Sequence, residues 1–419
     1  MKMGENLSMG RLLHNRHFVI LWLGQTVSAI GTPFTMLAMA WFVYTLTGSK
    51  AATGGILLAE AIPLVLFRLF AGVLVDRWDR RTTMLVTDLI RTAALLTPVF
   101  LYASGTLQLW HLFIVNIILG IAEAFFQPAS FAFLPSLVRK EELLNANSLL
   151  NTSIHGSALL GPILAGIFIS SFGAPNALLV DAITFAVSTL TLFLLPSRPI
   201  PRESRVHLFR ELVEGFAFYR ENRGLIWLLG LAATSNFGGG MILALFVPFC
   251  VELLHVSADG VGIVQSSAGI GMLIGSLVGP LLAPFSKKSV MLGAHAFSGV
   301  SILALFFANT LWYAVGFVGG FGLGVAIWNT FSGIIYQQRV PDSLRGRVQS
   351  VRLLVAQGSI PLGMAVSATV AEWIGLRGVL VLIGIAILFS ALIAWFASSL
   401  QFLEEKGQKA AVEINAPNE

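Results

Sequence analysis

The decapeptide Gly72–Arg81, which reads GVLVDRWDRR, decides how this sequence is organised. It places five charged residues between two long apolar runs, in a chain of 419 residues of which only 11% are charged. Soluble domains usually carry about 25% charged residues. With 56% hydrophobic residues, the chain has too few polar side chains to cover a soluble surface. The composition therefore predicts a membrane-embedded protein and excludes a disordered one.

The apolar runs around the decapeptide predict the transmembrane helices. A membrane helix needs about 20 mostly apolar residues, and twelve runs reach that length. They lie at residues 18–45, 53–75, 82–103, 109–133, 146–171, 175–195, 225–252, 259–284, 289–308, 311–334, 347–372 and 376–400. Because the runs are continuous and do not alternate with a period of two, they disfavour a β-barrel. The predicted fold is an all-α membrane protein.

A polar stretch, Pro196–Gly224, divides these spans into two sets of six. The predicted organisation is an N-terminal half at 1–195, a central cytoplasmic loop at 196–224, a C-terminal half at 225–400 and a cytoplasmic tail at 401–419. Within the loop, the amphipathic segment Leu208–Tyr219 has the pattern of a helix lying on the membrane surface.

The two halves share a weak internal repeat. Gly72 and the basic pair Arg80-Arg81 recur 207 residues later as Gly279 and Lys287-Lys288, at the corresponding point of the second half. Two similar membrane halves with a site between them are typical of transporters.

The positive charges predict the topology. Nearly all of the 26 lysines and arginines fall on the side of the N-terminus, whereas Lys50 and Arg377 fall on the opposite side. The positive-inside rule then places both termini in the cytoplasm, so the basic charge balance needs no nucleic-acid partner. The single cysteine, Cys250, excludes an internal disulfide. It is either a reactive thiol or a small apolar packing residue, and we favour packing.

The decapeptide resembles the loop-two motif of the major facilitator superfamily, Gly-x-Leu-x-Asp-Arg-x-Gly-Arg-Arg/Lys, with Asp79 in place of the second Gly. The strings WLGQ at 22–25, FQPA at 126–129 and LRGRV at 344–348 are similar to the macrolide-efflux and enterobactin-exporter group. The resemblance implies a major facilitator fold of two pseudo-symmetric six-helix halves. Two positions depart from the related exporters, which often carry an acid where Thr32 stands and an arginine in span four, where this chain has Glu123.

The resemblance also implies a conformational latch on the cytoplasmic side. Asp76 would hold the two halves together, with the start of span eleven near Arg347 as its partner. The residues assigned to this latch are Gly72, Asp76, Arg77, Arg80, Arg81, Asp88 and Arg347. The alternative is that the loop arginines act only as topology determinants.

A second motif in span five partly matches the pattern of exporters. Its residues are Gly156, Gly161, Pro162 and Gly166. A proline bends a helix and glycines allow a neighbouring helix to approach closely. The motif therefore predicts either a bend that shapes exporter gating or ordinary close packing.

Four acids lie within predicted spans of the first half, namely Glu60, Asp88, Glu123 and Asp181. Acids inside a membrane are costly and are functional candidates. An acid that releases a proton as substrate binds would support proton–drug antiport. We favour Glu123 and Glu60, followed by Asp181, as proton-coupling residues, each against the alternative of a structural acid. Asp88 is expected to pair with the loop-two arginines.

Polar residues within other spans are candidates for lining a substrate cavity. They are Gln25, Arg68, Asn116 and Asn236. No phosphate-binding Gly-Lys-Ser/Thr loop occurs, so the proton gradient is the expected energy source and no cofactor is expected. No nucleophile–base pair or metal-ligand spacing appears in the spans, so the chain is expected to be neither an enzyme nor a metal-binding protein.

The predicted function is proton-coupled efflux of an amphipathic small molecule, macrolide-like or another drug, across the cell membrane by alternating access. A siderophore or a lipid-like molecule is the alternative substrate. An alternative of another class is a membrane sensor or scaffold that does not transport. The expected partners are the small-molecule substrate and the lipid bilayer, with the chain acting as a monomer.

Overall fold

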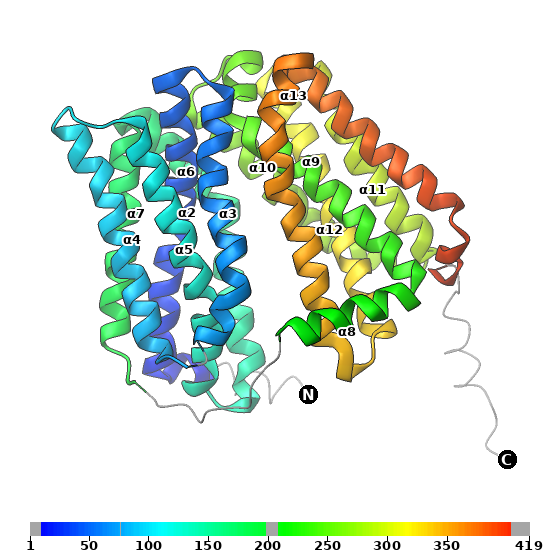
Figure 1. Cartoon of the computed structure of the whole chain (residues 1–419), viewed down its shortest axis with the longest axis horizontal. Helices are drawn as coiled ribbons and strands as arrows, with labels where there is room; N and C mark the ends of the chain where they lie inside the picture. Colours follow the sequence, from blue (N-terminus) through cyan, green and yellow to red (C-terminus); the bar gives the residue numbers. More distant parts are fainter. Residues whose placement is uncertain (1–9, 76, 198–207, 404–419) are drawn as a thin grey trace. The chain divides into compact units, whose positions relative to one another are not determined.

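The computed structural model describes residues 10–75, 77–197 and 208–403 of the chain. All regular structure in these ranges is helical, and eleven of the helices are long and apolar enough to cross a membrane (Figure 1). They are α2 (Arg16–Thr47), α3 (Lys50–Val75), α4 (Arg80–Ala103), α5 (Leu109–Phe133), α6 (Leu143–Phe172), α7 (Ala174–Phe193), α9 (Arg223–Leu254), α10 (Ala258–Val278), α11 (Lys287–Ala304), α12 (Leu311–Arg339) and α13 (Arg345–Phe396). A further helix is α8 (Leu208–Glu221), and the short 3-10 turns are η1 (Leu134–Ser136), η2 (Lys140–Glu142), η3 (Gly279–Leu282), η4 (Leu305–Phe307), η5 (Asp342–Leu344) and η6 (Ser398–Leu403).

The longest helix, α13, contains two membrane spans. Its 52 residues would extend about 78 Å as one straight helix, more than twice the roughly 30 Å of a bilayer core. Gly375, with φ 73° and ψ 169°, interrupts the helical backbone between the two spans. Counted in this way, the described residues contain the twelve predicted spans, and the prediction of an all-α membrane fold is confirmed.

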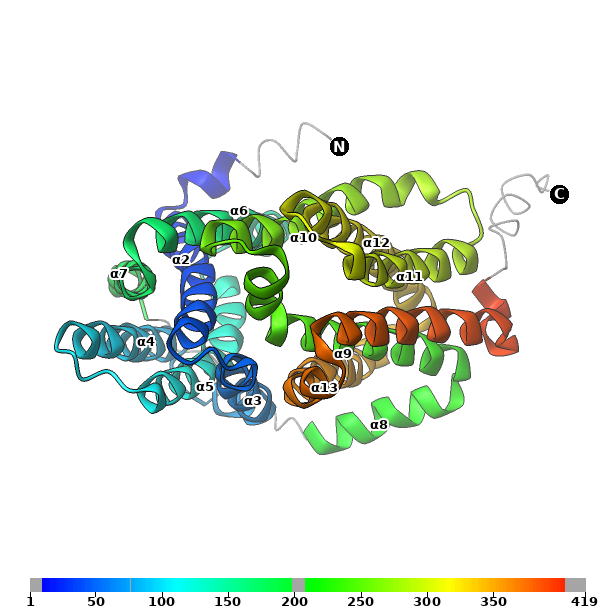
Figure 2. The ribbon, with the colours of Figure 1, turned by 90° about the horizontal axis from the view of Figure 1, so that it is seen from above.

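The chain forms two compact units. The first contains Met1–Val206 and Ala244–Ser266, and the second contains His207–Leu243 and Ser267–Glu419. In the first unit, α2 packs against α6 and α7, and α5 packs against α3 and α4 (Figure 2). In the second unit, α11 packs against α12 and α13. The helices α9 and α10 each contribute residues to both units.

The internal repeat is reproduced in the way two helices begin. Asp79 caps α4 by accepting a hydrogen bond from the backbone N–H of Thr82. Ser286, 207 residues later, caps α11 in the same way by accepting from the N–H of Ser289. Each cap satisfies a backbone donor that the first turn of a helix leaves unpaired. The basic pair therefore opens the equivalent helix in both halves.

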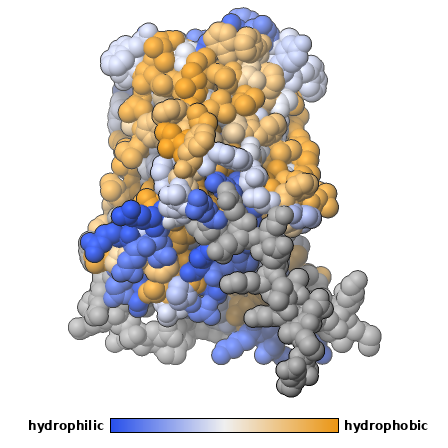
Figure 3. All heavy atoms as spheres, turned by 90° about the vertical axis from the view of Figure 1, so that its right-hand side faces the viewer, coloured by the Kyte–Doolittle hydropathy of each residue, from blue (hydrophilic) through white to orange (hydrophobic). Residues whose placement is uncertain are grey.

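The outer surface of the helices is strongly apolar. Trp373 and Phe396, for example, are 80% and 79% exposed. The upper part of the face drawn in Figure 3 is mostly hydrophobic, and polar residues gather in its lower part. Exposure of this kind in a soluble protein would mark a large interaction patch. On a chain with eleven apolar spanning helices among its described residues, it is the surface that contacts lipid.

The amphipathic segment predicted in the central loop is helical, as α8. It packs against α13, where Gly215 lies so close to the carbonyl oxygen of Arg347 that an added Cβ would be 2.6 Å away. Glu214 forms an ion pair with Arg347. The hydroxyl of Tyr219 donates a 3.0 Å hydrogen bond to that of Tyr336 on α12. These contacts fix α8 to the second unit, and its position on a membrane surface stays a prediction.

Candidate functional site

A buried charged cluster occupies the interior of the first unit. Asp88 and Arg91 lie three residues apart on α4, so they share one face of that helix, and Glu123 lies on the neighbouring helix α5. Asp88 is 0% exposed and Arg91 is 4% exposed. Burial makes an uncompensated charge very costly. The buried charge of Arg91 must therefore be compensated by the groups that contact it.

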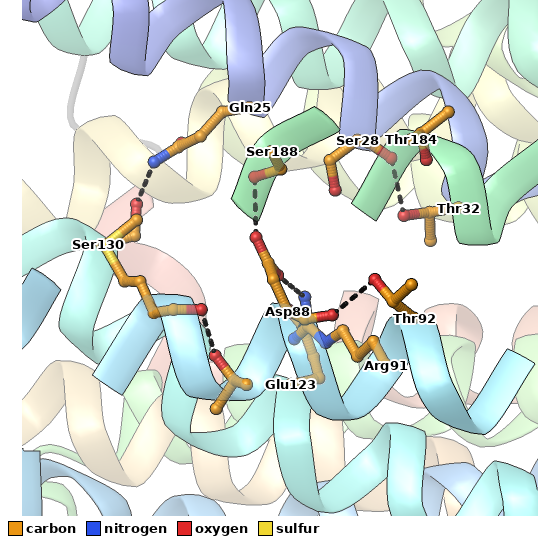
Figure 4. A network of polar contacts seen from close by, with 12 residues as sticks. Gln25, Ser28, Thr32, Asp88, Arg91, Thr92, Glu123, Ser130, Thr184 and Ser188 are labelled. Carbon is orange, nitrogen blue, oxygen red and sulfur yellow. Dashed lines mark hydrogen bonds and ion pairs between the residues drawn. The ribbon is translucent and has the colours of Figure 1, made fainter. Parts of the chain in front are cut away.

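Arg91 lies near the carboxylates of Asp88 and Glu123 (Figure 4), and it also contacts two aromatic rings. Its Nη2 is 2.5 Å from Oε2 of Glu123, and its Nη1 is 3.4 Å from Oδ1 of Asp88. Its guanidinium carbon lies 4.6 Å from the ring centre of Phe126 and 5.1 Å from that of Phe185. The cation is thus compensated both by ion pairs and by the electron-rich ring faces.

The pairing predicted for Asp88 is wrong. We expected the loop-two arginines as its partners, but its carboxylate pairs with Arg91 and accepts a 2.7 Å hydrogen bond from Ser188 on α7. The loop arginines instead donate to backbone carbonyls, Arg80 to Ala132 and Arg81 to Leu192, both at 2.7 Å. Carbonyls at helix ends lack intrahelical partners, and arginines are well suited to satisfy them.

Asp181 joins α7 to α2. Its carboxylate accepts hydrogen bonds from Thr35 at 2.6 Å and from Thr184 at 2.8 Å, and it is 1% exposed. Gly31 on α2 lies so close that an added Cβ would be 2.1 Å from the Asp181 carboxylate oxygen. The neighbouring Thr32, where related exporters often carry an acid, donates to the backbone carbonyl of Ser28. Asp181 is therefore held in a close helix contact.

Glu60 and Glu123 are less enclosed than the other two acids. Glu60 lies on α3, where its backbone packs against Gly120 of α5, and it is only partly buried. It is near enough to Glu123 and Arg91 to interact with their charges. The Glu123 side chain is 30% exposed, compared with 0% for Asp88. Of the two carboxylates on Arg91, Glu123 is the more exposed one.

The cavity candidates have different surroundings. Gln25 donates a 2.7 Å hydrogen bond to Ser130, joining α2 to α5, and Arg68 donates to Gln127 at 3.0 Å. Asn236, in the second unit, donates to the carbonyl of Ala356 at 2.8 Å. The prediction for Asn116 is wrong, because this side chain is 1% exposed and bonds to a carbonyl one turn back in its own helix.

A sequence profile of the family described as transmembrane secretion effector, a group of major facilitator transporters, matches residues 11–418. The chain belongs to the major facilitator superfamily. Macrolide efflux protein A of Streptococcus pyogenes is 28% identical over 93% of this chain and 98% of its own length. The multidrug efflux pump Tap of Mycolicibacterium fortuitum is 26% identical over 92% and 96%. The staphyloferrin A transporter of Staphylococcus aureus is 23% identical over 90% and 93%.

Solved structures of other transporters show the same fold. The nucleoside transporter NupG superposes with a TM-score of 0.71 at 15% identity, over 91% of this chain and all of that one. A bacterial homologue of the lysosomal transporter Spinster, in an inward-facing and unoccupied conformation, gives 0.70 at 16% identity, over 94% and 98%. Family and relatives are transporters, which confirms that the chain is not an enzyme.

The major facilitator loop motif is described only in part. Asp76 lies outside the described residues, so its predicted contact near Arg347 stays a prediction. Asp79, the departure from the motif, accepts from the backbone N–H of Thr82 at 2.7 Å and from the hydroxyl of Ser197 at 2.8 Å. Partial burial tends to raise the pKa of the Asp79 carboxyl, but these hydrogen bonds and the nearby Arg81 charge outweigh it and lower that pKa.

The exporter motif of the superfamily lies in close helix contacts. α6 runs unbroken through Pro162. A Cβ on Gly161 would lie 2.5 Å from the ring of Pro33 on α2, and one on Gly166 would lie 2.4 Å from the carbonyl oxygen of Ala258 on α10. Gly156 has nothing within 4 Å of such an atom. The close contacts of Gly161 and Gly166 thus support the packing interpretation of the motif. Its role in gating stays a prediction.

The central member of the buried cluster, Arg91, was not among the predicted site residues. Its spacing of three residues from Asp88 was the available signal, because that spacing places both side chains on one helix face. Ser188 donates its hydroxyl to Asp88, and Thr35 donates its hydroxyl to Asp181. Nothing in the sequence marks these two residues as partners of the acids, because serine and threonine are common in membrane helices and most of them bond to their own backbone.

Proposed function

We propose that this major facilitator transporter exports an amphipathic small molecule from the cytoplasm in exchange for protons. Relatives named as a macrolide efflux protein and a multidrug efflux pump support a drug-like substrate. The positive charges support a cytoplasmic location for both termini in the cell membrane. The proposed transporter works as a monomer in the bilayer, takes its energy from the proton gradient and needs no cofactor.

The contacts of Arg91 are the observation that carries this proposal. Asp88 is fully buried and receives a hydrogen bond from Ser188, so we assign it as the permanent counter-ion of Arg91. Glu123 is partly exposed, so we assign it as the carboxylate that gains and loses the proton. When Glu123 is protonated, Arg91 still has one ionised partner. The cluster can therefore change its charge without leaving a buried cation unpaired.

The two remaining acids have different proposed roles. Glu60 interacts with the charges of Glu123 and Arg91, so it is the second candidate for holding a proton. Asp181 accepts two threonine hydroxyls in a contact with no free space beside Gly31. We assign Asp181 to holding α2 against α7, which is the structural alternative for this acid.

The test uses a bacterial host that lacks its own drug pumps. Cells expressing the chain are expected to resist at least one macrolide or other lipophilic antibiotic, and a protonophore should abolish that resistance. Glu123→Gln should remove the protonophore-sensitive part of export, whereas Glu141→Gln, a matched change at an exposed acid, should leave it intact. Export that persists with the protonophore would contradict proton coupling, and no phenotype with any compound would contradict export.

A siderophore is the second candidate substrate. The staphyloferrin A transporter aligns over 90% of this chain, which favours this candidate. Secretion of an iron-chelating compound by expressing cells, without any change in antibiotic resistance, would select it over a drug. A lipid-like substrate and a non-transporting sensor or scaffold have no comparable observation in their favour.

A further inference from the structure

A second arginine lies within a membrane-spanning helix, in the second unit. Arg352 lies on α13, about two turns after the helix begins at Arg345, which is roughly 10 Å along the helix axis. Its side chain contacts α12, and α8 lies against the same end of α13 (Figure 1). Under the proposed topology, this end of the second unit faces the cytoplasm.

The guanidinium of Arg352 stacks on an aromatic ring and donates one hydrogen bond. Its central carbon lies 4.6 Å from the ring centre of Tyr336, and its Nη2 donates to the hydroxyl of Ser332 at 3.3 Å. Tyr336 and Ser332 are 7% and 2% exposed, so both contacts direct the cation between α12 and α13. The Tyr336 hydroxyl accepts a bond from Tyr219, and no described residue accepts one from it in turn.

Arg352 differs from Arg91 in what compensates its charge. Arg91 has two carboxylates beside it, whereas no carboxylate among the described residues forms an ion pair with Arg352. The acid that α8 places near this end of α13, Glu214, is paired with Arg347. A guanidinium carries several N–H donors in a planar fork, and only one described side chain accepts from that of Arg352. The fork can therefore bind an anion from outside the chain.

We propose that Arg352 and the hydroxyl of Tyr336 bind a carboxylate of the exported substrate. The guanidinium fork matches the two oxygens of a carboxylate, and the Tyr336 hydroxyl donates to one of them. A cation within a membrane helix is costly when it is unpaired, so an acidic substrate supplies the missing counter-ion. The inference rests on the proposed export function and narrows its amphipathic substrate to one with an acid group. Every residue of this site belongs to the second unit.

The phosphate of an anionic lipid offers the same chemistry from another source. Basic pockets on the cytoplasmic side of membrane helices bind such headgroups. We favour the substrate because the groups that hold the Arg352 guanidinium, Ser332 and Tyr336, are buried within the unit. A lipid phosphate would have to leave the membrane interface and enter between α12 and α13 to reach them. The lipid is therefore a defined alternative outcome of the test.

The first test measures binding of a simple amphipathic acid to the purified protein in phosphatidylcholine nanodiscs. The probe is radiolabelled phenylbutyrate, and its neutral counterpart phenylbutyramide should compete poorly. Arg352→Gln should weaken binding of the acid about tenfold, as expected for a hydrogen bond to a charged group. Arg220→Gln, a matched change at an exposed arginine of the second unit, should leave it unchanged. Absence of binding, equal competition by the amide, or unchanged binding to Arg352→Gln would overturn the proposal.

Two milder variants keep the result independent of folding defects. Tyr336→Phe retains the ring under the guanidinium but removes a donor, so it should weaken binding about three- to fivefold. Arg352→Lys keeps the charge without the fork and should bind more weakly than the unaltered protein. Normal binding to both variants would overturn the site. If phosphatidylglycerol raises the melting temperature of the unaltered protein but not of Arg352→Gln, the site holds a lipid headgroup and the substrate assignment fails.

The second test measures export of paired compounds that differ only in a carboxylate or an amide. In the pump-deficient host, Arg352→Gln should reduce export of the acids and retain export of the amides. An equal fall for both members of each pair would indicate a structural role for Arg352 and overturn its role in specificity. Absence of export of every compound by the unaltered protein would instead overturn the proposed function, and the binding measurements would still decide whether Arg352 holds an anion.

Discussion

Replacing Arg91 by methionine tests the central claim that a buried cation organises the first unit. The substitution keeps an unbranched apolar chain between Phe126 and Phe185 but removes the charge. Asp88, which is 0% exposed, would then keep only its hydrogen bond from Ser188. Glu123 is 30% exposed and can turn to water, so most of the damage is expected at Asp88.

The size of the effect follows from the burial of Asp88. Removing one partner of a buried ion pair usually costs about 3–5 kcal/mol, because the other charge remains buried without compensation. In a domain of this size, 1 kcal/mol corresponds to about 2–4 °C in melting temperature. We therefore expect Arg91→Met to lower the melting temperature of the protein by about 10 °C. Adding Asp88→Asn, which removes the stranded charge, should restore more than half of that loss.

The assay uses the buried thiol of Cys250 in the first unit, which reacts with a fluorogenic maleimide as the unit unfolds in detergent. The exposed Arg220→Met serves as the control for loss of a positive charge. A melting temperature for Arg91→Met within about 2 °C of the unaltered protein would refute the reasoning. So would a double variant that is no more stable than the single one, since the stranded charge would then not be the cause.

Two further changes test the helix contacts and the loop. Gly31→Ala puts a Cβ about 2.1 Å from a side-chain oxygen of Asp181 and from one of Thr184. Overpacking of this kind should lower the free energy of unfolding by about 1–3 kcal/mol. An unchanged melting temperature would contradict the close contact of α2 with α7. Asp79→Ala removes the cap of α4 that bonds to Thr82, which should cost about 1 kcal/mol at neutral pH. Because the pKa of Asp79 is lowered in the folded state, its contribution should be complete at neutral pH, decline below about pH 4 and vanish below the folded-state pKa. A stability difference that does not vary with pH would contradict this role.

The fold was predictable from the sequence because the bilayer dictates the length of each span. All twelve apolar runs became helical, and even the joined spans of α13 had been separated at residues 372–376, where Gly375 now marks the break. The segment at Leu208–Tyr219 was also helical, since its apolar residues repeat with the helical period. Such local patterns need no knowledge of which helices are neighbours.

The site was less predictable because its contacts join helices far apart in the sequence. The four acids could be predicted as candidates because each is a charged residue within an apolar span. The pairing of Arg91 with Glu123 could not be predicted, because it depends on how α4 and α5 are rotated towards each other. Asp88 was given the wrong partners because nearness in sequence to the loop arginines suggested them. Asn116 was expected to line a cavity, yet a buried amide in a membrane helix can bond to its own backbone.

The turn at Gly375 has a consequence for protein engineering. Since a single residue with φ 73° joins the last two spans, no loop there can absorb an inserted tag, and every side chain other than glycine would be strained at this corner. Under the proposed topology, epitopes for mapping the outer surface belong instead between α4 and α5, where Ser104, Gly105 and Thr106 are exposed.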